Sequence, residues 1–193
     1  SKKNVTDPDA LIARYGADTM RLFSLFAAPP ERDLEWSDKG VEGAYRFLNR
    51  VWGIVYKNSN ALCVKRDELK ENITDASRLL RKTHQTIKKV TVDMEKDYHF
   101  NTAIAALMEL ANEITASSVE NDEHAASVTF AVKNLLLMLS PFAPHISEEL
   151  WHVMGEEKSI FEHPWPKYDE TMAKDEEVEL VIQINGKVKG KAT

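Results

Sequence analysis

Three cations in the first half of the chain have the spacing of one helix face. Arg46, Arg50 and Lys57 fall within about 40° of one another if each residue turns a helix by about 100°. Gly53 falls on the same face and would permit close approach of another backbone. Charged side chains opposite an apolar face are usually only solvated, but such a stripe can also contact phosphates. The spacing alone leaves both interpretations open.

A metal site is the second chemistry that the spacing permits. His145 and Glu148 lie three residues apart in a stretch expected to be helical, as in some bundle metal sites. A metal needs more ligands, and the sequence has neither a second such pair nor a cysteine cluster, since Cys63 is alone. We therefore expect no metal, a structural hydrogen bond for His145, and core positions for Phe142 and Trp151. No phosphate loop, nucleophile context or paired catalytic carboxylates occur, so no catalytic residue is predicted.

The composition of the 193 residues is that of an ordinary globular protein, with 43% hydrophobic and 29% charged residues. The net charge of −6 argues against general coating of nucleic acid, so any RNA contact must use a local basic patch. The single cysteine fits a reducing compartment, and no apolar run is long enough to span a bilayer. We expect a cytoplasmic protein without membrane contact. The start at Ser1 reads like the middle of a longer protein.

Apolar residues that recur with the helical period predict the elements that position these side chains. Ser37 is expected to cap the helix that carries the basic stripe, and Asn101 to cap a later one. Gly16 is expected to end the first helix. The predicted helices cover about 7–16, 18–28, 37–60, 74–96, a segment from 101, 122–139 and 144–154.

The end of the chain has a different pattern. Residues 155–175 lose the helical period and contain Pro164 and Pro166, which is typical of a linker. Apolar and polar residues then alternate from Val178, and Asn185-Gly186 is a strong signal for a two-residue turn. This pattern predicts a β-hairpin that opens a further domain.

Three segments resemble, as text, the bacterial-type leucyl-tRNA synthetase family of class I aminoacyl-tRNA synthetases. The first is Phe26-Ala-Ala-Pro-Pro-Glu-Arg-Asp-Leu-Glu-Trp-Ser-Asp38, continued by Gly43 to Trp52. The second is Ser140-Pro-Phe-Ala-Pro-His-Ile-Ser-Glu-Glu-Leu-Trp151, and the third is 178–191 with its Asn-Gly-Lys. The resemblance is weak only across 60–97.

The resemblance implies an all-α fold, a helical bundle of the class I synthetase anticodon-binding type, with a short C-terminal β-hairpin. It also implies an organisation in four parts. These are 1–36, the end of the KMSKS loop with tRNA stem-contact helices; 37–156, the helical anticodon-binding-type domain; 157–175, a linker; and 176–193, the truncated start of a C-terminal domain.

The same resemblance assigns roles to individual residues. A remnant of the ATP-binding KMSKS loop would be formed by Ser1, Lys2 and Lys3, and the most important lysine of that loop would lie just before Ser1. Contacts with tRNA would be made by Arg21, Arg46, Arg50 and Lys57. Because the leucyl family makes little use of anticodon bases, these contacts are expected to reach the RNA backbone.

A resemblance of this kind implies a tRNA-docking fragment of leucine–tRNA ligase. The complete enzyme would activate leucine with ATP and Mg²⁺ and transfer it to tRNA(Leu), whereas the fragment alone is expected to be an inactive monomer without a cofactor. A helical-bundle scaffold for protein partners is the alternative, because composition and helical period fit it equally well. Salt-dependent binding of tRNA separates the two interpretations.

Overall fold

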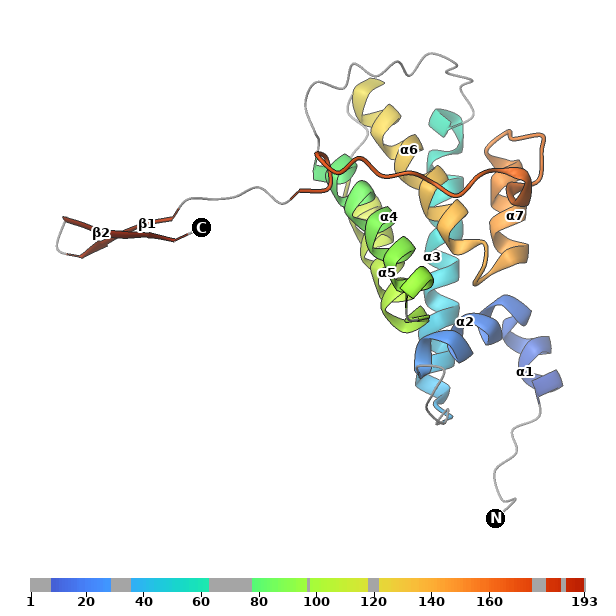
Figure 1. Ribbon diagram of the computed structural model, residues 1–193. Coiled ribbons are helices and arrows are strands. Elements are labelled where there is room, and N and C mark those ends of the chain that lie inside the picture. Colours follow the sequence, from blue (N-terminus) through green and yellow to red (C-terminus); the bar gives the residue numbers. More distant parts are fainter. Residues whose placement is uncertain are drawn as a thin grey trace.

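The computed structural model describes residues 8–28, 36–62, 78–96, 98–117, 122–174, 180–184 and 187–192 (Figure 1). These ranges are mainly helical, which confirms the predicted helical architecture. The helices are α1 (Pro8–Tyr15), α2 (Ala17–Ala27), α3 (Asp38–Leu62), α4 (Arg78–Lys96), α5 (Phe100–Ala116), α6 (Asp122–Leu139) and α7 (Pro144–Val153), with a short 3-10 helix, η1 (Ile160–Glu162).

Helix boundaries follow the expected signals where those signals are local. The backbone N–H of Gly40 donates to Ser37 Oγ at 3.2 Å, which confirms Ser37 as the cap of α3. Gly16 follows α1 with a φ of 85°, a conformation that glycine adopts at little cost. The proline pair predicted to break the chain between α2 and α3 lies outside the described residues, as does Asp7.

The prediction that Asn101 caps α5 was wrong. Helix α5 begins at Phe100, one residue before Asn101, and its N-cap is His99, whose side chain makes no capping bond. A distant carboxylate group organises this turn instead, because Thr102 Oγ1 donates to Asp93 Oδ2 at 2.6 Å. The His99 N–H donates to the backbone carbonyl of Asp93 at 2.9 Å. This corner is therefore built by α4, which local sequence does not encode.

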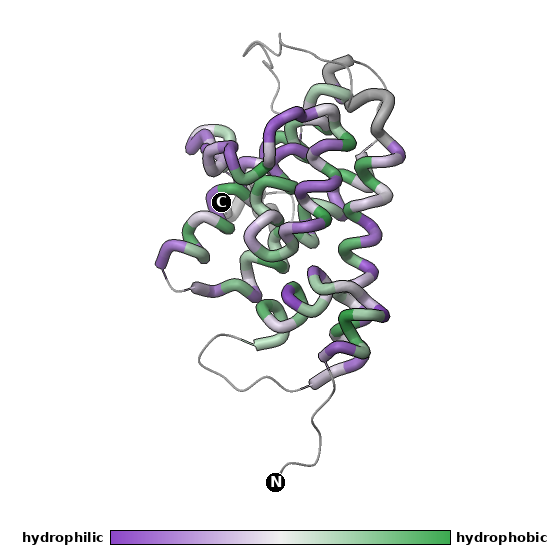
Figure 2. The backbone as a smooth tube through the Cα atoms, turned by 90° about the vertical axis from the view of Figure 1, so that its right-hand side faces the viewer, coloured by the Kyte–Doolittle hydropathy of each residue, from purple (hydrophilic) through white to green (hydrophobic). Residues whose placement is uncertain are grey.

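The core lies among α3, α5 and α6, with α4, α7 and α2 packed around them. Helix α6 is buried on several sides, since Val132, Leu135, Leu136 and Met138 have no exposed surface. Phe142 and Trp151 are 1% and 2% exposed, which confirms their predicted core positions. In Figure 2 hydrophobic and hydrophilic residues alternate along the described helices, as expected for helices with one buried side.

One carboxylate joins the N-terminal helix pair to α7. Asp18 is only 8% exposed. Its carboxylate accepts a hydrogen bond from the backbone N–H of Ile146 at 2.7 Å and pairs with His145 Nδ1 at 2.8 Å. Ala143, the N-cap of α7, has no side chain that can cap it, so Asp18 satisfies the helix N-terminus from outside. The structural hydrogen bond expected for His145 is confirmed.

Residues 159–174, here called the strap, lie along the bundle rather than away from it (Figure 1). Ile160 is 2% exposed, and Trp165 Nε1 donates to Thr91 Oγ1 of α4 at 2.8 Å. The backbone N–H of Asp169 donates to Nδ1 of His84, also on α4, at 3.1 Å. The absence of helical period in this segment was predicted, but its attachment to α4 was not.

Two short strands follow the strap. β1 (Leu180–Ile184) pairs antiparallel with β2 (Lys187–Ala192), and the register shifts between Ile182 and Gln183. The predicted Asn185-Gly186 turn lies outside the described residues, and a C-terminal hairpin that opens a further domain stays a prediction. No helix within the described part of the chain has the length and apolarity to cross a membrane.

Candidate nucleic-acid interface

The outward face of α3 carries the predicted basic stripe. Arg46, Arg50 and Lys57 are all exposed, and so is Gly53 between them. A Cβ added at Gly53 would meet nothing within 4 Å, so packing inside this chain does not require glycine there. The structure therefore brings three of the predicted cations onto one accessible helix face, and Gly53 leaves no side chain between Arg50 and Lys57.

The partners of these cations leave most of their charge unneutralised. Arg46 Nη1 lies 3.8 Å from Glu42 Oε2, and the two side chains are 69% and 50% exposed, so the pair is weak. Arg50 Nη1 donates to the amide oxygen of Asn112 on α5, a neutral acceptor. Lys57 pairs with no carboxylate among the described residues. This face can therefore offer its cations to an external anion.

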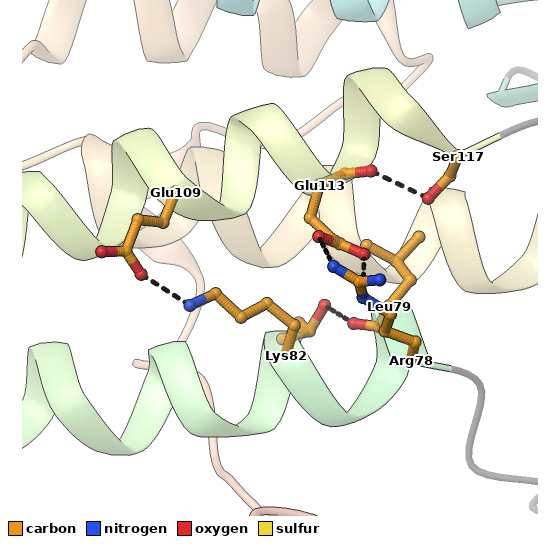
Figure 3. Close-up of polar contacts among 7 residues, drawn as sticks. Arg78, Leu79, Lys82, Glu109, Glu113 and Ser117 are labelled. Atoms are coloured by element: carbon orange, nitrogen blue, oxygen red, sulfur yellow. Dashed lines mark hydrogen bonds and ion pairs between the residues drawn. The ribbon is translucent and has the colours of Figure 1, made fainter.

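The cations of α4 differ, because four of them are matched with carboxylates. The pairs are Arg78–Glu113 at 2.8 Å, Lys82–Glu109 at 2.6 Å, Lys88–Glu170 at 2.7 Å and Lys89–Asp93 at 2.7 Å. Figure 3 shows the first two pairs joining α4 to α5. The hydrogen bond to Glu170 raises the pKa of Lys88. These side chains hold the bundle and the strap together.

A row of exposed aromatic rings also runs along α3, about a third of a turn around the helix from the basic stripe. Tyr45, Trp52 and Tyr56 are 42%, 37% and 48% exposed. The rings of Trp52 and Tyr56 are stacked, with centroids 4.9 Å apart and planes at 17°, and Tyr45 makes an edge contact with Tyr15 of α1. Sequence reasoning missed this row, although the spacings of seven and four residues place the three rings on one face.

A hollow of about 360 Å³ opens where α2, α3 and α7 meet. Helix α3 contributes Tyr45, Asn49 and Trp52 to its wall, and α7 contributes His145 and Glu149. The wall thus combines aromatic rings with an amide, an imidazole and a carboxylate. A planar group that also forms hydrogen bonds suits such a lining.

The remaining predicted site residues lie elsewhere. Arg21 is exposed on α2, and its Nη2 donates to the backbone carbonyl of Pro141 at 3.2 Å, so it ties α2 to the turn before α7. Ser1, Lys2 and Lys3 lie outside the described residues. Among the described residues, no group of three or more histidine, cysteine, aspartate or glutamate side chains could hold a metal ion. Glu148, considered above as a metal ligand, accepts a hydrogen bond from the Ile160 backbone at 2.8 Å.

Comparison with known families decides what kind of domain this is. Residues 76–193, well over half of the chain, match the model for the anticodon-binding domain of tRNA ligase. The chain belongs to this family. The anticodon-binding family thus accounts for the bundle from α4 onward.

Similar proteins place this member of the anticodon-binding family near one kind of ligase. A leucine–tRNA ligase of Geotalea daltonii is 51% identical over the whole chain, and one of Fusobacterium nucleatum is 49% identical over 98% of it. These alignments confirm the resemblance predicted from the sequence. The chain spans about a quarter of the length of these relatives, 24% and 23% respectively.

Solved structures show the same arrangement of helices. The LeuRS in the ternary LeuRS–tRNA–LeuAMS complex from Agrobacterium radiobacter K84 agnB2 matches the whole chain, and 25% of its own length, with a TM-score of 0.80 and 31% identity. The apo methionyl-tRNA synthetase of Mycobacterium tuberculosis matches 76% of the chain and 34% of its own length, with a TM-score of 0.55 and 18% identity. The second likeness concerns the fold alone.

Proposed function

We propose that this chain is a tRNA-docking module of a leucine–tRNA ligase, which in its complete form activates leucine with ATP and transfers it to tRNA(Leu). The observation that carries the proposal is the outward face of α3, where Arg50 and Lys57 have no carboxylate partner among the described residues. A relative with the same fold is named in a complex with tRNA, which supports RNA as the anion.

Docking contributes to catalysis by positioning. A guanidinium presents several donors to phosphate oxygens in a fixed plane, and a lysine ammonium adds a point charge. Contacts of this kind fix where the RNA lies without reading its sequence. Because a misplacement of about 1 Å at a reacting centre can cost about 100-fold in rate, a distant docking face affects charging of the tRNA.

The organisation into four parts is part of this proposal. Residues 1–36 would join the bundle of 37–156 to the ATP-binding side, with Ser1, Lys2 and Lys3 as a remnant of the ATP loop. Residues 157–175 would lead to a further domain that begins at 176–193. In the complete enzyme, ATP with Mg²⁺ and leucine would bind outside the described residues. We further propose a cytoplasmic monomer.

The decisive experiment measures binding of tRNA(Leu) and an unrelated tRNA to the chain over a range of salt concentrations. Replacing Arg46, Arg50 and Lys57 together by Ala should weaken binding of both RNAs alike. Each lost phosphate contact should reduce the slope of log affinity against log salt by roughly one unit. Thermal unfolding should change little, because the three side chains face away from the core.

A matched variant replaces three paired cations of α4, namely Lys82, Lys88 and Lys89, by Ala. It removes the same charge, so a simple effect of net charge would weaken binding equally in both variants. We expect the α4 variant to retain most of the affinity. Equal losses in the two variants, or tRNA binding that ignores salt, would contradict the proposal and favour the scaffold interpretation.

A further inference from the structure

The aromatic row on α3 has no role in the core. Tyr45, Trp52 and Tyr56 lie on a part of the helix where solvated polar residues are the norm, yet each leaves more than a third of its surface exposed. Neighbouring exposed rings of this size usually mark an interaction site. The exposed faces of these rings are therefore a candidate contact surface for a partner.

The arrangement of the rings resembles a rigid stacking surface more than a loose apolar patch. Tyr56 lies against Trp52 with the planes at 17°, which limits the rotation of the indole. Trp52 also lines the hollow between α3 and α7, so part of the indole faces open space. A third flat ring can stack on this pair at low cost in conformational entropy, because the first two are already aligned.

The surrounding charges identify the chemistry of the partner. Arg46 directly follows Tyr45, and Lys57 directly follows Tyr56, so the basic stripe runs along the same helix about a third of a turn around from the aromatic row. Exposed rings and cations that are at most weakly neutralised, on the same helix, are complementary to a polymer of flat bases on a phosphate backbone. The hollow adds Asn49 and His145, whose side chains can form hydrogen bonds with the edge of a base.

We propose that Trp52, supported by Tyr56 and beside Tyr45, is a stacking platform for an unpaired base of the bound RNA. This inference rests on the proposed function, since the cations of α3 must first hold the backbone. It goes further by adding contact with a base to a helix for which the sequence resemblance predicts backbone contacts alone. Proteins that recognise RNA commonly stack its unpaired bases on aromatic side chains.

The test compares two RNA probes, a hairpin with an unpaired loop and a blunt duplex with the same number of phosphates. Replacing Trp52 by Leu should weaken binding of the hairpin about 5- to 100-fold, because stacking of one base is worth about 1–3 kcal/mol. Binding of the duplex should stay within about twofold, and the salt slope for both probes should be unchanged, since no phosphate contact is lost.

Matched variants separate stacking from general disturbance. Trp52→Phe keeps an aromatic face and should recover most of the hairpin affinity. Phe161→Leu removes an aromatic ring that is 58% exposed on η1, and should leave both probes unaffected. The hairpin should also quench tryptophan fluorescence in the wild-type chain and quench it less in Trp52→Phe, a readout that does not depend on the Leu variant folding.

The outcomes distinguish this inference from the function on which it rests. If the wild-type chain binds neither probe in a salt-dependent way, the docking function and the platform both fail. If it binds both probes but Trp52→Leu changes neither affinity, the docking function stands and the platform is wrong, as it would be if another protein segment covered these rings. Equal loss for the hairpin and the duplex would also overturn the platform, because stacking requires an unpaired base.

Discussion

The outward faces of α3 and α4 both carry several cations, but these cations differ in their partners. The cations of α4 pair with carboxylates of α5, the strap and α4 itself. On α3, Arg50 bonds a neutral amide and Lys57 pairs with no described carboxylate. The number of cations therefore does not distinguish the two faces, whereas the distribution of their partners does.

The most buried of the α4 contacts offers the strongest test of this difference. Asp93 is 7% exposed and accepts hydrogen bonds from Lys89 and from Thr102 Oγ1. Asp93→Ala should lower the free energy of unfolding by about 2 kcal/mol, because it removes a nearly buried carboxylate that accepts hydrogen bonds from an ammonium and a hydroxyl. Chemical denaturation measures the loss, and affinity for tRNA should stay within about twofold.

The control for this variant is Glu95→Ala, which removes an exposed carboxylate two residues further along α4. It should change stability by less than about 0.5 kcal/mol. A large loss of tRNA affinity in Asp93→Ala without a loss of stability would break the comparison, because it would place α4 in the RNA interface.

A smaller loss of stability is expected at the contact between α4 and the strap when the pH is lowered. Burial lowers the pKa of His84 from its ordinary value of 6.5, against the opposing charge of Asp169. His84 Nδ1 accepts the Asp169 N–H, so a proton on this nitrogen would break the bond. Because the unfolded chain takes up the proton first, this contribution is complete above pH 6.5 and is lost as the pH falls toward the pKa of folded His84.

The expected loss is about 1 kcal/mol, the net value of one hydrogen bond. Melting curves between about pH 7.5 and 5.5 measure it, and the fluorescence of Trp165 reports on the strap. His84→Asn keeps an acceptor that cannot be protonated and should be less sensitive to pH in this range. The hydrogen bonds from Thr171 lower the pKa of Asp169 from 3.8, so its effect falls in a separate, more acidic range. Identical pH profiles for the two chains would show that His84 does not hold the strap.

The smallest effect concerns the exposed pair of Lys82 and Glu109. Their side chains are 30% and 64% exposed, so their interaction is weakened by solvent despite the short distance of 2.6 Å. A double-mutant cycle with Lys82→Met and Glu109→Gln should give a coupling of about 0.5 kcal/mol in stability. High salt should reduce this coupling further, and a coupling unaffected by salt would show that the pair is not solvated.

The sequence predicts structural features that depend on residues close together in the chain, such as the positions and faces of helices. The period of apolar residues located the helices, and α6 has the expected bounds of Asp122 and Leu139. It also placed Arg46, Arg50 and Lys57 on one face, because one helix carries all three. Each of these results follows from a single element and its repeat.

Contacts between distant parts of the chain could not be predicted in this way. Arg21 bonds a carbonyl 120 residues away, and Asp18 caps a helix 128 residues away, so no local spacing encodes either contact. Asn101 is a good capping residue, but the corner before α5 is held by Asp93 of α4. The carboxylate partners of Arg78, Lys82 and Lys88 lie on α5 and the strap, so the sequence alone does not show that these cations of α4 are neutralised.

The hydrogen bond between Asp18 and the start of α7 has a consequence for the orientation of α3. Helix α3 packs against α2 and α7 as well as α5 and α6, and its 25 residues span about 37 Å. A tilt of about 5° about one end would move the other end by about 3 Å, more than the misplacement that a reacting centre tolerates. Asp18, which touches none of the stripe residues, thus helps to fix the angle at which α3 would present the basic stripe to the proposed RNA.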